Sequence, residues 1–371
     1  MNKNFKIGFL GGGLDSVVGY THFVAAQMDR RFTVESGVFS REPEVNDATA
    51  EYWRITRKYG SIDAFIDNEK DKLDAIAVLL PTPDHFEAVR TLADLNIPII
   101  SEKPLFSSLD DVKKIQSHKA IHQKFLAVTY NYIAYPILSE LRKMVLSGEL
   151  GEIINVHLEM PQESFMNPPK AVDYPAGWRK KDGKIPSILL DLLSHLFSLS
   201  YFVTGKRITR VFSQFSKFSG YNVVDDAKIV ADYHDGAKGF LWVSKTALGN
   251  RNGLKLAVYG KKASAVWIQA DPENLCLNRK GGARYVLDRG SDLDVSKNKL
   301  YNRMMPGHPS GFIEAFANLY FEIANALDDF YADRDYKTRP LVWTLEKEKE
   351  NFEFMDAVVR SAGEGIAVEV N

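Results

Sequence analysis

The tripeptide Glu102-Lys103-Pro104 places an acid and a base directly after a short apolar run, Ile97 to Ile100. Such a run is typical of a buried parallel strand, and open α/β sheets bind ligands at the carboxyl ends of their strands. Pro104 restricts the backbone of Lys103 to extended conformations, so covalent geometry helps to aim the lysine. Lys103 could stabilise negative charge on a substrate oxygen. The alternative is a solvated charge pair at a strand exit.

Asp191 and His195 form a second candidate group, four residues apart in an apolar segment from Ile188 to Thr204. The segment predicts a central helix ending at Gly205, and the spacing puts both side chains on one face. They need partners there, because burying either of them unpaired is unfavourable. The pair could satisfy itself, or exchange protons with a substrate. A metal site would need further ligands that the sequence does not offer.

The elements that would position these residues begin with a predicted strand, Lys6 to Leu10, followed by Gly11-Gly12-Gly13-Leu14-Asp15-Ser16. This matches a dinucleotide-binding fingerprint with Ser16 in place of the third glycine. A predicted helix from Ser16 to Asp29 would present its N-terminal amides to phosphate. The alternative is an ordinary glycine-rich turn between a strand and a helix.

Apolar runs and helical patterns then alternate as in a doubly wound parallel sheet. Strands are predicted at 32–39, 75–80 and 125–129, with helices near 44–59 and 109–122. We therefore predict an N-terminal Rossmann domain over residues 1–130.

The exit of the second predicted strand carries Ser40 and Arg41, where NAD-dependent enzymes usually have an acid for the ribose. A hydroxyl and a guanidinium suit a 2′-phosphate, which favours NADP over NAD. Arg41 could instead stack on the adenine or be solvated.

A third exit, Pro81-Thr82-Pro83-Asp84-His85, follows the strand 75–80. Its prolines hold the chain extended, and Asp84 can cap the next helix. His85, taken alone, fits a surface or capping role better than a catalytic one.

Residues 131–371 read as a second, α+β domain with a large, open and mainly antiparallel sheet. Hairpins are predicted about Asp235-Gly236 and Gly260-Lys261-Lys262. A long loop, 161–186, contains the flat pair Trp178 and Arg179, and loops of that length are usually functional. One sheet face is a predicted homodimer or homotetramer surface, with Trp242, Val258, Tyr259 and Trp267 as its apolar residues.

The composition is that of an ordinary soluble protein. The 371 residues have a formal net charge of -1, which implies no general attraction to nucleic acid or anionic membranes. The single cysteine, Cys276, fits a reducing compartment. We expect a cytoplasmic protein.

Taken in order, these motifs resemble the glucose–fructose oxidoreductase / inositol dehydrogenase / MocA (Gfo/Idh/MocA) family over nearly the whole chain. Besides the glycine turn, they include Thr82-Pro83-x-His85, Glu102-Lys103-Pro104, Tyr130-Asn131-Tyr132 with Pro136, and Asp191-x-x-x-His195. The resemblance implies an NAD- or NADP-dependent oxidoreductase that acts on a sugar, cyclitol or sugar-derived polyol without a metal.

The resemblance also implies roles for individual residues. Lys103, Asp191 and His195 would form the catalytic group. Family members often have glycines just before the aspartate, where this chain has Ser187-Ile188-Leu189-Leu190. The resemblance therefore does not identify the substrate. The implied cofactor-binding residues are Gly11, Gly13, Ser16, Ser40, Arg41, Pro81, Thr82, His85, Glu102, Lys103, Asn131, Trp178 and Arg179, the last two near the nicotinamide.

Two other functions stay open. The same scaffold could run a transient oxidation that permits glycoside cleavage and then return the hydride. It could also be a non-catalytic dinucleotide-binding regulator, although such a protein needs only the glycines and not Lys103, Asp191 and His195.

Overall fold

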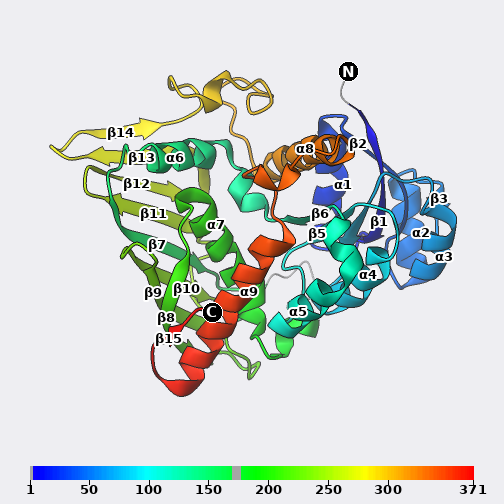
Figure 1. Cartoon of the computed structure of the whole chain (residues 1–371), viewed down its shortest axis with the longest axis horizontal. Coiled ribbons are helices and arrows are strands. Elements are labelled where there is room, and N and C mark those ends of the chain that lie inside the picture. The colour runs from blue at the N-terminus through cyan, green and yellow to red at the C-terminus, as the bar shows by residue number, and fades with distance from the viewer. Residues whose placement is uncertain (1–2, 169–176) are drawn as a thin grey trace. The chain divides into compact units, whose positions relative to one another are not determined.

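The protein is described by a computed structural model over residues 3–168 and 177–371 (Figure 1). By packing, the chain forms two compact units, Met1–Ala134 with Phe312–Lys349 and Tyr135–Gly311 with Glu350–Asn371. Nothing in the sequence indicated that residues 312–349 return to the first unit. The division into a cofactor-binding domain, 1–130, and a substrate-binding domain, 131–371, stays a prediction. Within the described ranges, no helix has the length and apolar character needed to cross a membrane.

The first unit contains a parallel sheet whose described strands are ordered β3-β2-β1-β4-β5-β6. The order reverses beside β1, which pairs with both β2 and β4 and so makes the topological switch point of a Rossmann fold. This confirms the predicted fold. The strands are β1 Phe5–Gly11, β2 Phe32–Val38, β3 Arg57–Lys58, β4 Ala75–Leu79, β5 Ile99–Glu102 and β6 Leu126–Thr129.

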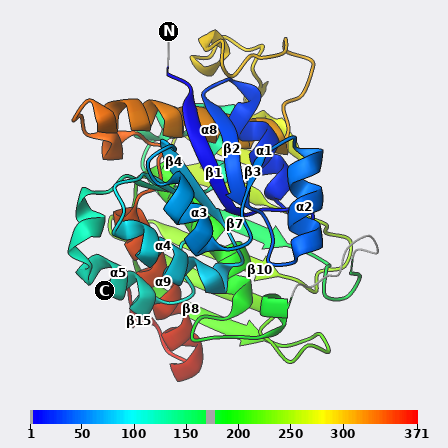
Figure 2. The same cartoon turned by 90° about the vertical axis from the view of Figure 1, so that its right-hand side faces the viewer.

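The helices of the first sheet's crossovers differ from the prediction in several of their bounds, most of all after β2. The helix predicted over 44–59 ends at Tyr52, because Arg54 takes a left-handed conformation with φ of 57° and leads the chain into β3. Ser61 then caps an unpredicted helix, α3, which Figure 2 shows with α2 beside β1 to β3. The helices are α1 Gly19–Met28, α2 Pro43–Tyr52, α3 Ile62–Glu69, α4 His85–Ala93 and α5 Leu109–Ser117.

Helix α8, Phe312–Tyr331, completes the first unit from late in the sequence. Its buried Tyr320 hydroxyl lies 2.8 Å from Nδ1 of His22 on α1. Arg31, at the start of β2, donates to Asn325 and Asp328 on the same helix. These polar contacts fix α8 against α1 and the start of β2.

The second unit contains a mixed sheet whose described strands are ordered β14-β13-β12-β11-β7-β10-β9-β8-β15. The pairing is antiparallel except between β7 and β10, which confirms the predicted sheet and both hairpins. The strands are β7 Ile153–Pro161, β8 Ile208–Ser216, β9 Asp226–Tyr233, β10 Lys238–Ser244, β11 Lys255–Gly260, β12 Ala263–Ile268, β13 Asp271–Arg279, β14 Arg284–Leu287 and β15 Val368–Glu369.

One face of this sheet is covered by α6, Pro136–Leu146, by α7, Ser194–Thr204, and by the part of α9, Leu345–Glu364, that belongs to the second unit (Figure 1). Val258 and Trp267 point to this face and are fully buried. Their predicted place on an oligomer surface was therefore wrong. Side chains alternate along a strand, so their neighbours, such as Tyr259 and Ile268, face outward.

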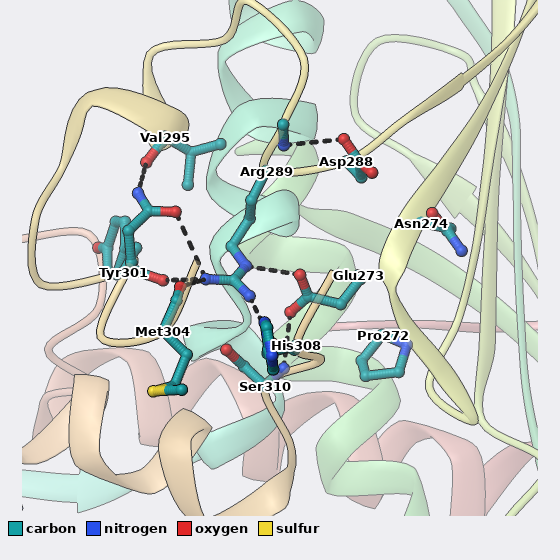
Figure 3. A network of polar contacts seen from close by, with 12 residues as sticks. Pro272, Glu273, Asn274, Asp288, Arg289, Val295, Tyr301, Met304, His308 and Ser310 are labelled. Atoms are coloured by element: carbon teal, nitrogen blue, oxygen red, sulfur yellow. Dashed lines mark hydrogen bonds and ion pairs between the residues drawn. The ribbon is translucent and has the colours of Figure 1, made fainter. Parts of the chain in front are cut away.

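A long segment after β14 is held by buried Arg289 (Figure 3). Its guanidinium pairs with Glu273 of β13, the Nε–Oε2 distance being 2.5 Å. It also donates to the main-chain oxygens of Tyr301, Met304 and His308, at 2.9, 3.2 and 2.9 Å. One side chain thus ties this irregular segment to the sheet, in keeping with the several donors that arginine offers.

Candidate active site

The predicted site residues fall into two groups, one in each unit, and the first begins at the glycine turn after β1. Gly11 and Gly12 have φ of 83° and 76°, which favour glycine. Helix α1 starts at Gly19, and a Cβ there would lie 1.9 Å from the oxygen of Gly12. Gly19 therefore makes the close approach expected of a third fingerprint glycine. The predictions that Ser16 fills that place and begins the helix were wrong, because three more residues intervene.

Ser16 and Gly13 still take part in the turn. Ser16 Oγ accepts from Gly19 N at 3.2 Å, and Gly13 N donates to the oxygen of Phe39 at the end of β2. A Cβ on Gly13 would meet that same oxygen at 2.9 Å. The turn is thus a tight backbone cradle at the switch point of the sheet, which fits a dinucleotide pyrophosphate.

Two acids from other loops lie beside Ser40 and Arg41 at the exit of β2. Ser40 Oγ donates to Asp15 at 3.4 Å, and Arg41 lies 3.6 Å from Asp84. Arg41 is largely exposed, its side chain being 81% accessible, so this ion pair is weak. The two carboxylates reduce the positive field that a 2′-phosphate would meet.

His85 is buried rather than a surface or capping residue, so that prediction was wrong. It is 1% exposed, with Nε2 at 2.7 Å from the oxygen of Leu80 and Nδ1 at 3.0 Å from that of Pro104. Burial lowers the pKa of His85, while the carbonyl oxygens and Glu102 act in the opposite direction. The ring thereby links the ends of β4 and β5. The neighbouring Pro81 is exposed and Thr82 buried.

Glu102 is buried at the end of β5. Its Oε1 accepts from Thr129 Oγ1 at 2.5 Å and lies 3.1 Å from Nε2 of His22. Burial alone would raise the pKa of Glu102, but His22, Lys103 and Thr129 together hold it below its usual value. The other ring nitrogen of His22, Nδ1, lies 2.8 Å from the Tyr320 hydroxyl. Lys103 follows, half-buried, and joins Pro104 by a cis peptide bond.

Asn131 adds a buried donor to this group. It follows β6 in a short turn of 3₁₀ helix, Asn131–Ala134, and is 2% exposed. Among the residues that the structure describes, nothing accepts a hydrogen bond from its Nδ2. Native proteins seldom leave a buried amide in this state, so a bound ligand is a natural acceptor. The glycine cradle and Asn131 together fit a nicotinamide dinucleotide.

The second group surrounds Asp191, which lies in a π-helical turn, Leu189–Leu193, just before α7. Arg179 donates to both carboxylate oxygens, at 3.0 and 3.2 Å, and Lys245 Nζ donates to Oδ2 at 2.7 Å. The Arg179 guanidinium also lies 4.4 Å from the ring centre of Trp178. His195 is buried in the first turn of α7. π-turns are frequent at functional sites.

Lys245 is a site residue that the sequence interpretation missed. It is 1% exposed and directly follows β10, where the alternating strand pattern ends. A lysine at a strand exit was the signal that singled out Lys103, and the same signal could have found Lys245. With Arg179 it keeps Asp191 an ionised acceptor, because neighbouring cations favour the charged form of a carboxyl group.

A Rossmann sheet with a glycine cradle, a lysine at a strand exit and a buried aspartate and histidine define a dinucleotide-dependent oxidoreductase. Residues 5–130 match the model of the oxidoreductase family with an NAD-binding Rossmann fold, and residues 138–266 match the GFO/IDH/MocA C-terminal domain. The protein belongs to the Gfo/Idh/MocA family of oxidoreductases.

Similar proteins span the whole chain. The uncharacterized oxidoreductase YfiI of Bacillus subtilis is 25% identical, with 98% of this chain and 96% of that protein covered. A crystal structure of an inositol dehydrogenase homologue complexed with NAD+ from Azotobacter vinelandii is 26% identical, with a TM-score of 0.91 over 99% of this chain and 97% of that one. The structure of an inositol dehydrogenase homologue from the same organism with NADH and myo-inositol is 27% identical, with a TM-score of 0.89 and coverage of 99% and 98%.

Proposed function

We propose that this oxidoreductase transfers a hydride between nicotinamide and a hydroxyl-bearing carbon of a sugar, cyclitol or sugar derivative. The observation that carries the proposal is Asp191, kept ionised by Arg179 and Lys245 one helical turn before a buried histidine. Family membership and the similar structure that holds NADH and myo-inositol support the substrate class.

In this proposal His195 takes the proton of the substrate hydroxyl, since an imidazole with a pKa near about 6.5 exchanges protons at neutral pH. Lys103 donates a hydrogen bond to the same oxygen and stabilises its developing negative charge. Asp191 accepts from a neighbouring hydroxyl. The nicotinamide, when bound, supplies or accepts the hydride.

The remaining predicted residues would hold the cofactor. Gly11 and Gly13 would bring backbone to the pyrophosphate, and the stacked pair of Trp178 and Arg179 would lie near the nicotinamide. Asn131 Nδ2 would donate to the bound dinucleotide. Roles for Ser16, Ser40, Arg41, Pro81, Thr82, His85, Glu102 and Lys103 as direct cofactor contacts likewise stay predictions.

Absorbance at 340 nm with NAD+ or NADP+ and a panel of polyols, cyclitols and sugars tests the function. We expect net cofactor reduction with at least one member, lost in Asp191→Ala. Release of an aglycone from glycosides with no net reduction would instead favour the transient-oxidation cycle. Dinucleotide binding without any turnover, in either direction, would favour a regulator and contradict the proposal.

For the cofactor we keep the preference for NADP, which rests on the exposed Arg41 guanidinium beside Ser40. NADPH should bind more tightly than NADH in a fluorescence titration, and Arg41→Ala should remove the difference. The matched control is Arg90→Ala, which changes an exposed arginine on α4. Tighter binding of NADH by the wild type would show that Asp15 and Asp84 outweigh Arg41.

We also propose a homodimer or homotetramer formed through the outward face of the second unit's sheet. Phe212, Val230 and Phe240 are cross-strand neighbours on β8, β9 and β10, and each is more than a third exposed. Charged residues such as Lys228 and Asp232 flank them along β9. An apolar row with a polar border is typical of a protein interface.

A further inference from the structure

The turn that carries Lys103 is held by buried polar side chains from distant parts of the sequence. The first is Glu348, which lies in the opening turn of α9 and is fully buried. Its Oε1 accepts from the backbone N–H of Leu105 at 2.8 Å. Tyr130 donates to the same carboxylate at 3.0 Å, and Trp343 Nε1 donates to it at 3.1 Å. Glu348 is thus fixed by aromatic donors and in turn fixes Leu105.

The second is His85, whose ring lies beside backbone carbonyl oxygens of the same turn. Its Nδ1 lies 3.0 Å from the oxygen of Pro104 and 3.2 Å from that of Leu105. Its Nε2 lies 2.7 Å from the oxygen of Leu80, which ties the turn to the exit of β4. The N–H of Leu105 is therefore bonded by one buried side chain, and its carbonyl oxygen lies 3.2 Å from a ring nitrogen of another.

Such an arrangement is costly unless every polar group is satisfied, since a buried carboxylate and a buried imidazole both lose hydration. A simple turn after a parallel strand needs neither group. The backbone of Pro104 and Leu105 is anchored by side chains that themselves have fixed partners, which leaves the preceding residue little freedom. Fixed supporting residues of this kind are what keeps a reactive side chain in its productive geometry.

We propose that Glu348 and His85 are positioning residues for Lys103. This inference rests on the proposed function, in which the Lys103 ammonium meets the substrate oxygen. Neither residue touches substrate; both act by holding the backbone that follows the lysine. Their loss should displace the ammonium while the cofactor cradle at β1 is unchanged.

The test uses full-length Glu348→Gln and His85→Gln, with Glu364→Gln on the exposed end of α9 and the exposed His122→Gln as matched controls. Loss of supporting residues of this kind typically costs about 10–100-fold in activity. We expect kcat to fall by that factor in both variants, with substrate KM within about threefold of wild type. Cofactor Kd should also stay within about threefold in Glu348→Gln, because Glu348 is not among the residues predicted to hold the cofactor. The controls should behave as wild type.

A second measurement follows Lys103 itself and needs no substrate. Competitive acylation with acetic anhydride, read by mass spectrometry over a pH series, gives the reactivity of Lys103 relative to exposed Lys72. We expect this ratio to change at least threefold in Glu348→Gln and His85→Gln and to stay constant in the controls. If Glu348→Gln fails to fold, the same measurements on His85→Gln and Tyr130→Phe test the inference. Tyr130→Phe removes one hydrogen-bond donor to Glu348.

The two readouts separate this inference from the function on which it rests. Changed Lys103 reactivity in a protein that turns over no polyol would keep the positioning roles and reject the proposed chemistry. Wild-type reactivity and wild-type kcat in folded variants would overturn the positioning roles. Lower melting temperature with unchanged kcat and reactivity would also overturn them, since it would show a purely structural role.

Discussion

Two cations hold Asp191, and this decides which role it can take. A carboxylate that accepts hydrogen bonds from Arg179 and Lys245 stays ionised at neutral pH and cannot serve as a proton donor. It can still accept from a substrate hydroxyl, because each carboxylate oxygen has more than one lone pair. This agrees with the proposed role of His195 as the group that transfers the proton.

The sharpest prediction at the residue scale concerns turnover. His195→Asn should lower kcat on the order of 10²–10⁴-fold through loss of the general base. Lys103→Ala should lower it at least as much, because a charge and an orienting donor are both removed. Melting temperature and cofactor Kd should remain near the wild-type values in both. Normal turnover by His195→Asn, or failure of Lys103→Ala to fold, would disprove this assignment.

Glu102 provides a prediction about pH. Burial would raise its pKa, but His22, Lys103 and Thr129 lower it overall, so folding binds fewer protons at this group than unfolding does. Its contribution to the free energy of unfolding is therefore present above the unfolded pKa, near about 4.3, and lost as the pH falls toward the folded value. Urea unfolding of wild type and Glu102→Gln should differ by about 1.5–3 kcal/mol at pH 7. The difference should shrink below about pH 4; a gap that stays constant between pH 7 and pH 3.5 would refute this.

At the scale of elements, the turn between β1 and α1 depends on Gly19. A methyl group there would overlap the oxygen of Gly12, so Gly19→Ala must separate α1 from the cradle. We expect it to lower the free energy of unfolding by about 1–3 kcal/mol or more and to weaken dinucleotide binding. Gly60→Ala is the control, since nothing lies within 4 Å of its added Cβ. Unchanged dinucleotide affinity in Gly19→Ala would contradict the role given to this turn.

The elements that the sequence predicted well are those set by local pattern. The buried runs of β1, β4 and β5, the hairpin at Gly236 and the left-handed cap at Gly205 all follow from residue type and period. The exits of those strands place Lys103 correctly at the carboxyl edge of the sheet.

The residues that the sequence analysis assigned wrongly or overlooked depend on contacts that no local pattern encodes. The third fingerprint glycine was assigned to the usual spacing, whereas the loop before Gly19 is three residues longer. The residues next to His85 in the sequence give no sign that three backbone carbonyl oxygens lie around its ring. Lys245 and Glu348 meet their partners across 54 and 243 residues of sequence, so only the fold reveals them.

At the scale of the whole molecule, the outward sheet face predicts assembly. Phe240→Asp places a charge in the apolar row and should shift the protein from oligomer to monomer in light scattering at micromolar concentration. Tyr52→Asp, which changes an exposed aromatic residue on α2, is the control and should leave the mass unchanged. A wild-type monomer at that concentration would refute the assembly.

The late return of residues 312–349 to the first unit has a consequence for synthesis on the ribosome. The first 134 residues lack α8 and Glu348 until nearly the whole chain has emerged, and the second unit also waits for 350–371. At ~5–20 residues per second, the first unit stays incomplete for about 10–40 s after its N-terminal part has been made. The surface of α1 that packs against α8 lacks its partner during that interval, so nascent chains stalled at residue 311 should be cleaved by protease far faster than released protein. Chaperone demand in the cell should accordingly be set by this waiting time and not by the stability of the finished enzyme.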